Sequence, residues 1–495
     1  MLVSLYTVRV VLETLGTEDY GIYNVVGGVV VLFTFLNSAM TSATQRFLNF
    51  AMGQNDTEQV RDIYSASLVI HAAIAVAVVV LAETAGLWFF YTWLNIPSER
   101  QEAAFAVYQF SVAATVIGIL QVPYRATIIA YEKMSFFAIL SIVEAVLKLG
   151  VVFLLPVIPF DNLAVYAFLL FVTGIIVLFM HKLYCNKNFE PAHFKHCKEN
   201  GLFRQLLGFS SWTVFSRIAG LGMNQGINIL MNIFRGVTMN AAMGITMQVN
   251  SAVYQFVGNF QTAFNPQIVK SYSAKDYDGL MNLVFLTSKV SFCLILIFAL
   301  PLCINADFVL RIWLGSVPEY TVQFTQLILL SSLVSAIDGP LWMSVLATGN
   351  IRKNEVITSC FTLANLPLVL LFLFIGFSPV WILVIRVVLS VLTLVWRISF
   401  LKSKIEFPVS LFYRKTIVPL AVITVLSVFL VAFSQNLFIA DWNRLIASCF
   451  TSIVSITCLM YCIGLDRQEK KMLQKWIKLK AKGDSDYPIQ GKGRK

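Results

Sequence analysis

Seven charged side chains interrupt long apolar stretches of this sequence, and their types suit them to chemistry. They are Arg9, Glu144, Lys148, Arg217, Lys289, Asp338 and Arg386. A charge in an apolar segment is costly, so such residues tend to face a hydrated cavity or an opposite charge. A guanidinium can bind two phosphate oxygens at once, and a carboxylate can relay protons. The set therefore predicts a binding site for an ionic ligand.

The basic members of this set predict a cationic cavity. Arg9 and Arg217 have no acidic residue within one helical turn, and they occupy matching places at the start of two apolar segments. Lys148, Lys289 and Arg386 are further candidates for lining the cavity. Lys289 and Arg386 have an alternative interpretation, in which their long side chains extend toward the membrane surface.

The acidic members are candidates for ion coupling. Glu144 and Lys148 are four residues apart, so they can pair on one helix face. Mutual neutralisation explains that pair as well as a functional role does. Asp338 lies two residues before Pro340, which with Pro123 interrupts an apolar segment and permits bending. We therefore predict ion-coupling sites at Glu144 and Asp338, and hinges at Pro123 and Pro340.

The segment 207–231 is the most polar of the apolar stretches. It reads "SSWTVFSRIAGLGMNQGINILMN" from position 210. Asn224, Gln225 and Asn228 are candidates for binding a hydroxyl-rich or phosphate-bearing substrate in a hydrated lumen. The alternative is that small and amide residues here serve helix packing.

The sequence lacks the motifs of nucleotide binding, serine hydrolysis and dithiol redox chemistry. The chain has no phosphate-binding P-loop, no G-x-S-x-G and no C-x-x-C pair. One segment combines metal-ligating residue types, but its spacings match no standard zinc pattern. Its members are His181, Cys185, His193, His196 and Cys197. We therefore predict no metal, no cofactor, no nucleic-acid partner and no enzymatic activity.

The elements that position these residues are membrane-spanning helices. The 495 residues are 58% hydrophobic and only 13% charged, whereas soluble domains carry about 25% charged residues. Thirteen windows are long and apolar enough to cross a bilayer: 20–41, 62–83, 103–129, 135–158, 162–183, 207–231, 236–263, 281–304, 319–348, 355–376, 379–400, 414–434 and 442–465. The fold prediction is an all-α integral membrane protein.

The distribution of lysine and arginine predicts the topology and the number of spans. Of the 37 such residues, 28 lie in alternate gaps and the C-terminal tail, and four lie in the opposite gaps. By the positive-inside rule, both termini are cytoplasmic. An even number of spans follows, so the apolar run 1–12 is a fourteenth span. That run is short for a bilayer, and we expect a truncated first helix rather than a signal peptide.

Weak internal repeats predict two lobes. "WLNIPSE" at 93–99 recurs as "WLGSVPE" at 313–319, and the Pro123 and Pro340 segments correspond at a similar offset. The predicted lobes are 1–206 and 207–403, each with six spans, followed by two helices in 404–465 and a basic cytoplasmic tail in 466–495. Such repeats are a signature of secondary transporters.

Two stretches resemble a known family: "TVRVVLETLGTEDYGIYNVVGGVVVLF" and the segment that begins "MNQGINILMNIFRGVTMNAAMGITMQVN". They resemble the polysaccharide-transporter branch, the Wzx-type O-antigen and capsule flippases, of the multidrug/oligosaccharidyl-lipid/polysaccharide (MOP) exporters. The resemblance implies a MOP/MATE-like fold of about 14 helices in two pseudo-symmetric lobes with an extra helix pair. It implies a multi-pass protein of the bacterial inner membrane that moves undecaprenyl-diphosphate-linked oligosaccharide outward by alternating access. Arg9 and Arg217 would contact the diphosphate or acidic sugars.

The implied partners are lipid-linked oligosaccharide, membrane lipids and other polysaccharide-assembly membrane proteins. Two alternatives stay open. A multidrug/cation antiporter of the same superfamily would favour an acidic lumen, whereas five of the seven charges within the spans are basic. A membrane glycosyltransferase or polymerase would need an acidic pair or a long outer loop. The glycan, the coupling ion and the oligomeric state are not specified by these residues.

Overall fold

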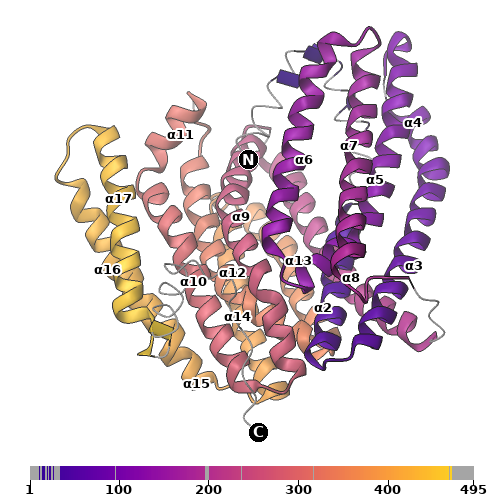
Figure 1. Ribbon diagram of the computed structural model, residues 1–495. Helices are drawn as coiled ribbons and strands as arrows, with labels where there is room; N and C mark the ends of the chain where they lie inside the picture. The colour runs from indigo at the N-terminus through magenta and orange to yellow at the C-terminus, as the bar shows by residue number, and fades with distance from the viewer. Residues whose placement is uncertain are drawn as a thin grey trace. The chain divides into compact units, whose positions relative to one another are not determined.

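The structure is a computed structural model that describes residues 10–11, 14–16, 19, 22–23, 26, 34–94, 96–194, 200–235, 237–315, 317–467 and 469–470. Helices dominate this part of the chain and no strand occurs in it (Figure 1). The principal helices are α2 (Thr34–Gly53), α3 (Thr57–Leu81), α4 (Leu87–Trp93), α5 (Gln101–Ala130), α6 (Met134–Leu154), α7 (Asn162–Asn188), α8 (Asn200–Arg235), α9 (Val237–Ser273), α10 (Tyr277–Ile304), α11 (Ala306–Leu314), α12 (Thr321–Thr348), α13 (Arg352–Phe374), α14 (Trp381–Ile405), α15 (Val409–Phe412), α16 (Val418–Gln435) and α17 (Asp441–Leu459).

The described helices confirm the prediction of an all-α membrane protein. Ten of the segments within the described ranges are long and apolar enough to cross a bilayer. The more polar α8 and α9 are 36 and 37 residues long, enough to span about 30 Å of hydrocarbon with room to spare. The opening run 1–12 and the tail beyond 470 lie largely outside the described residues.

The chain forms two compact units. The first contains Met1–Ile227, Thr262–Leu280 and Met343–Pro367, and the second contains Asn228–Gln261, Met281–Trp342 and Leu368–Lys495. In the first unit, α5 packs against α2, α3 and α7. In the second, α16 packs against α17. The lobe boundaries at 206 and 403 stay a prediction.

Helix α5 is central to its unit because it buries residues along its whole length. Ala104, Val107 and Tyr108 lie in one apolar cluster near its start, and Tyr124 and Ile128 lie in another near its end. The hydroxyl of Tyr108 donates to the carbonyl of Ala82, 2.7 Å away, at the start of a short π-helical turn, Ala82–Gly86. A buried hydroxyl thereby satisfies the backbone where the regular helix is interrupted.

Arg100 joins three gaps between spans that the charge pattern assigns to the outer side. Its guanidinium pairs with Asp19 and, at 2.5 Å, with Asp161, which also caps the first turn of α7. Partial burial works to raise the pKa of Asp161. The N–H groups of Ala164 and Leu163 and the Arg100 charge outweigh that effect and hold the pKa below its ordinary value.

Contacts at other gaps join segments that the charge pattern assigns to the cytoplasm. The ammonium of Lys270 lies 2.5 Å from a carboxylate oxygen of Glu132. Ser273 donates to the carbonyl of Phe50 at 2.7 Å. Both contacts connect predicted inner gaps with one another, so they agree with the alternation of the spans.

Prolines in the second unit release backbone carbonyls that other helices then satisfy. Pro340 in α12 cannot donate to the carbonyl of Ala336, and Gln261 Nε2 from α9 donates to that oxygen at 3.0 Å. Pro301 in α10 likewise releases Ile297, whose carbonyl accepts from Ser452 of α17 at 3.1 Å. Membrane helices tolerate proline where neighbours satisfy the freed group. The hinge role of Pro340, and that of Pro123 within α5, stays a prediction.

Candidate functional site

Helix α8 carries the predicted polar segment and packs it against α13 in the first unit. Ser216 donates to the carboxylate of Glu355 and shares a 3.0 Å hydrogen bond with Ser359. Nearly three turns further along, a Cβ at Gly226 would meet the side chain of Leu366 at 2.5 Å. Gly226 therefore serves close packing against α13, and Ser216 provides the polar contact between the two helices.

Glu355 is the buried carboxylate of this region, and sequence reasoning missed it. Its exposed fraction is 3%, and Asn354 Nδ2 donates to it at 3.2 Å. The hydropathy window 355–376 placed Glu355 at the edge of a span, where a charge is unremarkable. Only the pairing with Ser216, 139 residues away, reveals that the carboxylate lies inside a helix interface.

Arg217 follows Ser216 on α8, but its side chain is exposed. No acidic residue in the described part of the chain forms an ion pair with it. Asn224 lies seven residues later, two helical turns away, and so shares the face of Arg217. Asn224 and Asn228 are partly buried and Gln225 is exposed. Arg9, the proposed counterpart of Arg217, lies outside the described residues.

Asp338 has a partner that sequence reasoning did not assign. Its carboxylate pairs with the guanidinium of Arg397 from α14, which is nearly fully buried. Arg397 lies within the predicted span 379–400, yet the charge pattern counted it with the cytoplasmic gap. Arg386, one of the cavity candidates, is on the same helix α14 and partly buried. The second unit thus contains a buried, neutralised acid–base pair between α12 and α14.

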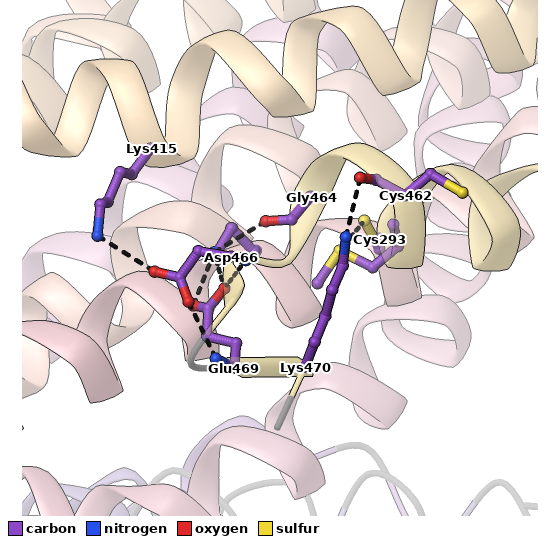
Figure 2. A network of polar contacts seen from close by, with 9 residues as sticks. Cys293, Lys415, Cys462, Gly464, Asp466, Glu469 and Lys470 are labelled. Carbon is purple, nitrogen blue, oxygen red and sulfur yellow. Dashed lines mark hydrogen bonds and ion pairs between the residues drawn. The ribbon is translucent and has the colours of Figure 1, made fainter. Parts of the chain in front are cut away.

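Lys289 is also neutralised within the second unit. Its exposed fraction is 1%, and its ammonium lies 2.7 Å from both carboxylate oxygens of Glu469 and 2.9 Å from the carbonyl of Gly464. The Glu469 carboxylate accepts a hydrogen bond from the backbone N–H of Asp466, and the Asp466 carboxylate accepts one from the backbone N–H of Glu469. Asp466 also pairs with Lys415 at 3.1 Å (Figure 2). These contacts hold the first residues after α17.

Glu144 and Lys148 form the predicted pair on α6. Their charged atoms are 2.6 Å apart, and both side chains are well exposed. Neither the ion-coupling role of Glu144 nor the cavity role of Lys148 follows from this geometry. The structure therefore supports the pairing and leaves both functional roles as predictions.

The described residues hold no group of three or more potential metal ligands. His181 Nδ1 lies 2.9 Å from the carbonyl of Val177 on its own helix, and Cys185 is buried beside Tyr124. His196 and Cys197 lie outside the described residues. His181 and Cys185 therefore serve as buried helix residues in this part of the chain.

Solved structures share this arrangement of helices. A MATE transporter in complex with MaD3S matches with a TM-score of 0.70 at 12% identity over 82% of this chain and 93% of its own. An outward-facing multidrug resistance MATE family transporter of the MOP superfamily matches with a TM-score of 0.66 at 13% identity, over 81% and 92%. A MOP superfamily transporter from Pyrococcus furiosus matches with a TM-score of 0.66 at 13% identity, over 83% and 93%.

The fold is that of the MATE transporters. The MOP/MATE-like fold that the resemblance implies is thereby confirmed. The MOP superfamily, the transport role and the absence of enzymatic activity stay predictions. No protein-family model and no curated protein matches the sequence. The MATE fold does not by itself specify a substrate, because one fold can carry different sites.

Proposed function

We propose that this protein moves a lipid-linked diphosphate oligosaccharide across the bacterial inner membrane. The observation that carries the proposal is the balance of charge in the described spans. Asp338 is neutralised by Arg397 and Glu144 by Lys148, whereas Arg217 is exposed on the polar face of α8. An exposed guanidinium that shares a helix face with Asn224 suits a ligand with phosphate and hydroxyl groups.

Alternating access through a cationic cavity is the mechanism that we infer. Arg217, with Arg9 on the first helix, would bind the diphosphate. Asn224, Gln225 and Asn228 would bind sugar hydroxyls, with Lys148, Lys289 and Arg386 as further basic groups. Of these, Lys148 and Lys289 already have carboxylate partners in the described structure. Because Lys289 is also almost fully buried, we expect it to contribute least to substrate binding. Bending at Pro123 and Pro340 would accompany the change of access.

Multidrug/cation antiport is the second candidate. It is favoured by the multidrug resistance transporter among the similar structures and by the buried carboxylate of Glu355. For the Pyrococcus furiosus transporter, a reversed polarity of the binding pocket has been taken to suggest a different function. The MATE fold is thus compatible with binding sites of either polarity.

Deleting the protein and locating the lipid-linked glycan separates these candidates. The proposed function predicts that the glycan accumulates on the cytoplasmic leaflet, and that plasmid-borne protein restores its export. An unchanged leaflet distribution with increased sensitivity to cationic drugs would refute flipping in favour of antiport. An altered chain length of the exported glycan would instead indicate a polymerase.

A further inference from the structure

A basic pocket in the first unit shares no residue with the candidate site. Its volume is about 360 Å³, and none of its eleven lining residues is acidic. Three arginines and a tryptophan define it, and we call it the arginine pocket: Arg46, Arg204, Arg352 and Trp212. They come from the end of α2, the first turns of α8 and the start of α13.

Arg46 is the rigid part of the arginine pocket. Its Nε and Nη2 donate to the carbonyls of Leu346 and Ala347 at 3.2 and 3.1 Å, at the end of α12. The guanidinium lies 5.5 Å from the ring centre of Phe209. Gly349 has a positive φ of 76°, and a Cβ there would meet Nη2 at 2.6 Å. The turn after α12 therefore needs glycine both for its conformation and for its approach to Arg46.

Arg46 retains hydrogen-bonding capacity after these contacts. A guanidinium has five N–H groups, and the two contacts to the end of α12 use two of them. The exposed fraction of Arg46 is only 8%. No ion pair of Arg46 with a carboxylate occurs in the described residues. A buried cation without a neutralising carboxylate is a favourable partner for an anion.

Arg204 and Arg352 are the accessible part of the arginine pocket. Both side chains are exposed, and the guanidinium of Arg352 lies 5.1 Å from the ring centre of Trp212. Arg204, Gly208 and Trp212 are spaced by four residues on one face of α8. The face thus places a charge at one end and an aromatic ring at the other, with a glycine that leaves room between them.

The volume of the pocket suits a headgroup. Sites for small molecules usually occupy about 300–1,000 Å³, so 360 Å³ is at the small end of that range and accommodates a phosphate or diphosphate group. The neighbouring pocket, with Asp56, Glu58 and Asp62, shares only Gln205 with it. The preference for an anion therefore belongs to the arginine pocket rather than to the whole surface.

The charge pattern predicts that the pocket is on the cytoplasmic side. All three arginines lie in gaps that the charge pattern assigns to the cytoplasm, close to the ends of membrane spans. Basic pockets between spans on that side suit phosphate headgroups. Guanidinium groups bind phosphate oxygens in bidentate fashion. The aromatic rings form an apolar wall of the pocket, which can contact the first carbons of a lipid chain.

We propose that the arginine pocket binds the phosphate groups of a lipid headgroup on the cytoplasmic side, and that its ligand is the diphosphate of the lipid-linked substrate before transport. The identification of the ligand as the lipid-linked substrate rests on the proposed function. The inference that the pocket binds a phosphate group depends only on the residues of the pocket. Arg46 fixes the anion, while Arg204 and Arg352 close over it from the aqueous side.

Binding of labelled farnesyl diphosphate to the purified full-length protein in detergent tests this proposal. The double variant Arg204→Gln/Arg352→Gln removes two exposed charges, so the fold is preserved. Its matched control, Lys182→Gln/Lys187→Gln, removes two exposed charges from α7 in the same unit. We expect the first variant to bind at least about tenfold more weakly, and the control to bind within about twofold of the wild type.

Two results would overturn the pocket assignment: wild-type affinity in Arg204→Gln/Arg352→Gln, or an equal loss in the lysine control. Competition with short-chain phosphatidylglycerol identifies the source of the phosphate. If phosphatidylglycerol displaces farnesyl diphosphate only weakly, the diphosphate lipid is supported as the ligand. If the two compete at equal concentrations, that identification is overturned and the pocket is assigned to bulk anionic lipid. If binding passes this test but vesicles containing the protein flip no diphosphate lipid, the proposed function fails while the phosphate site stands.

Discussion

Breaking the Lys289–Glu469 pair should release the segment that follows α17. The pair is almost fully buried, with side-chain exposures of 2% and 10%, and the lysine makes three hydrogen bonds, which is the full capacity of an ammonium. Removing one partner of a buried pair costs about 3–5 kcal/mol. Lys289→Met should therefore increase the population of the released segment by roughly two to four orders of magnitude.

Limited trypsin digestion after Lys470 measures this release in the folded protein. When opening is fast relative to cleavage, the digestion rate follows the population of the open form. The matched control is Lys415→Met, which removes an exposed partner of Asp466, with side-chain exposures of 40% and 32%. Because exposed pairs contribute about 0–1 kcal/mol, the control should change the rate by less than roughly fivefold. Equal rates for the two variants would refute the reasoning.

Three further predictions concern buried partners and pH. Arg397→Met should lower the yield of folded protein, because it leaves Asp338 without its cation, and Asp338→Leu/Arg397→Met should restore the yield measured by size-exclusion chromatography. Gln261→Leu should reduce stability by about 1–3 kcal/mol, because the carbonyl that Pro340 releases loses its donor; a thermal denaturation midpoint equal to that of the wild type would contradict this. Asp161→Asn should reduce thermal stability at pH 7, with the difference disappearing as the pH falls below about 4. The pKa of Asp161 is lower in the folded protein than in the unfolded chain. The stability that its carboxylate provides is therefore fully present above the ordinary pKa, and it is lost as the pH falls through the folded pKa.

Features that depend on local composition could be predicted from the sequence. The helical class follows from apolar windows whose lengths match a bilayer. The segments joined by Arg100 and by Lys270 lie in gaps that the positive-inside rule groups together. The Glu144–Lys148 pair follows from a spacing of four residues on one helix.

The partners of buried charges could not be predicted, because they are distant in sequence. Glu469 is 180 residues from Lys289, and the carbonyl that fixes Arg46 is 300 residues away from it. Hydropathy describes each window by itself and contains no information on which windows pack together. Glu355 and Arg397 were overlooked for this reason, since each lies at the end of an apolar window where a charge normally meets water.

Transport per folded protein in Arg217 variants tests the central claim most directly. The assay uses vesicles that contain equal amounts of transporter and measures movement of a lipid-linked diphosphate between leaflets. Arg217→Ala should lower the rate at least about tenfold, and Arg217→Lys should be intermediate, because an ammonium keeps the charge but loses the bidentate geometry. Arg311→Ala, which removes an exposed arginine on the predicted outer side, should transport like the wild type. Wild-type rates in both Arg217 variants would contradict the cationic binding site.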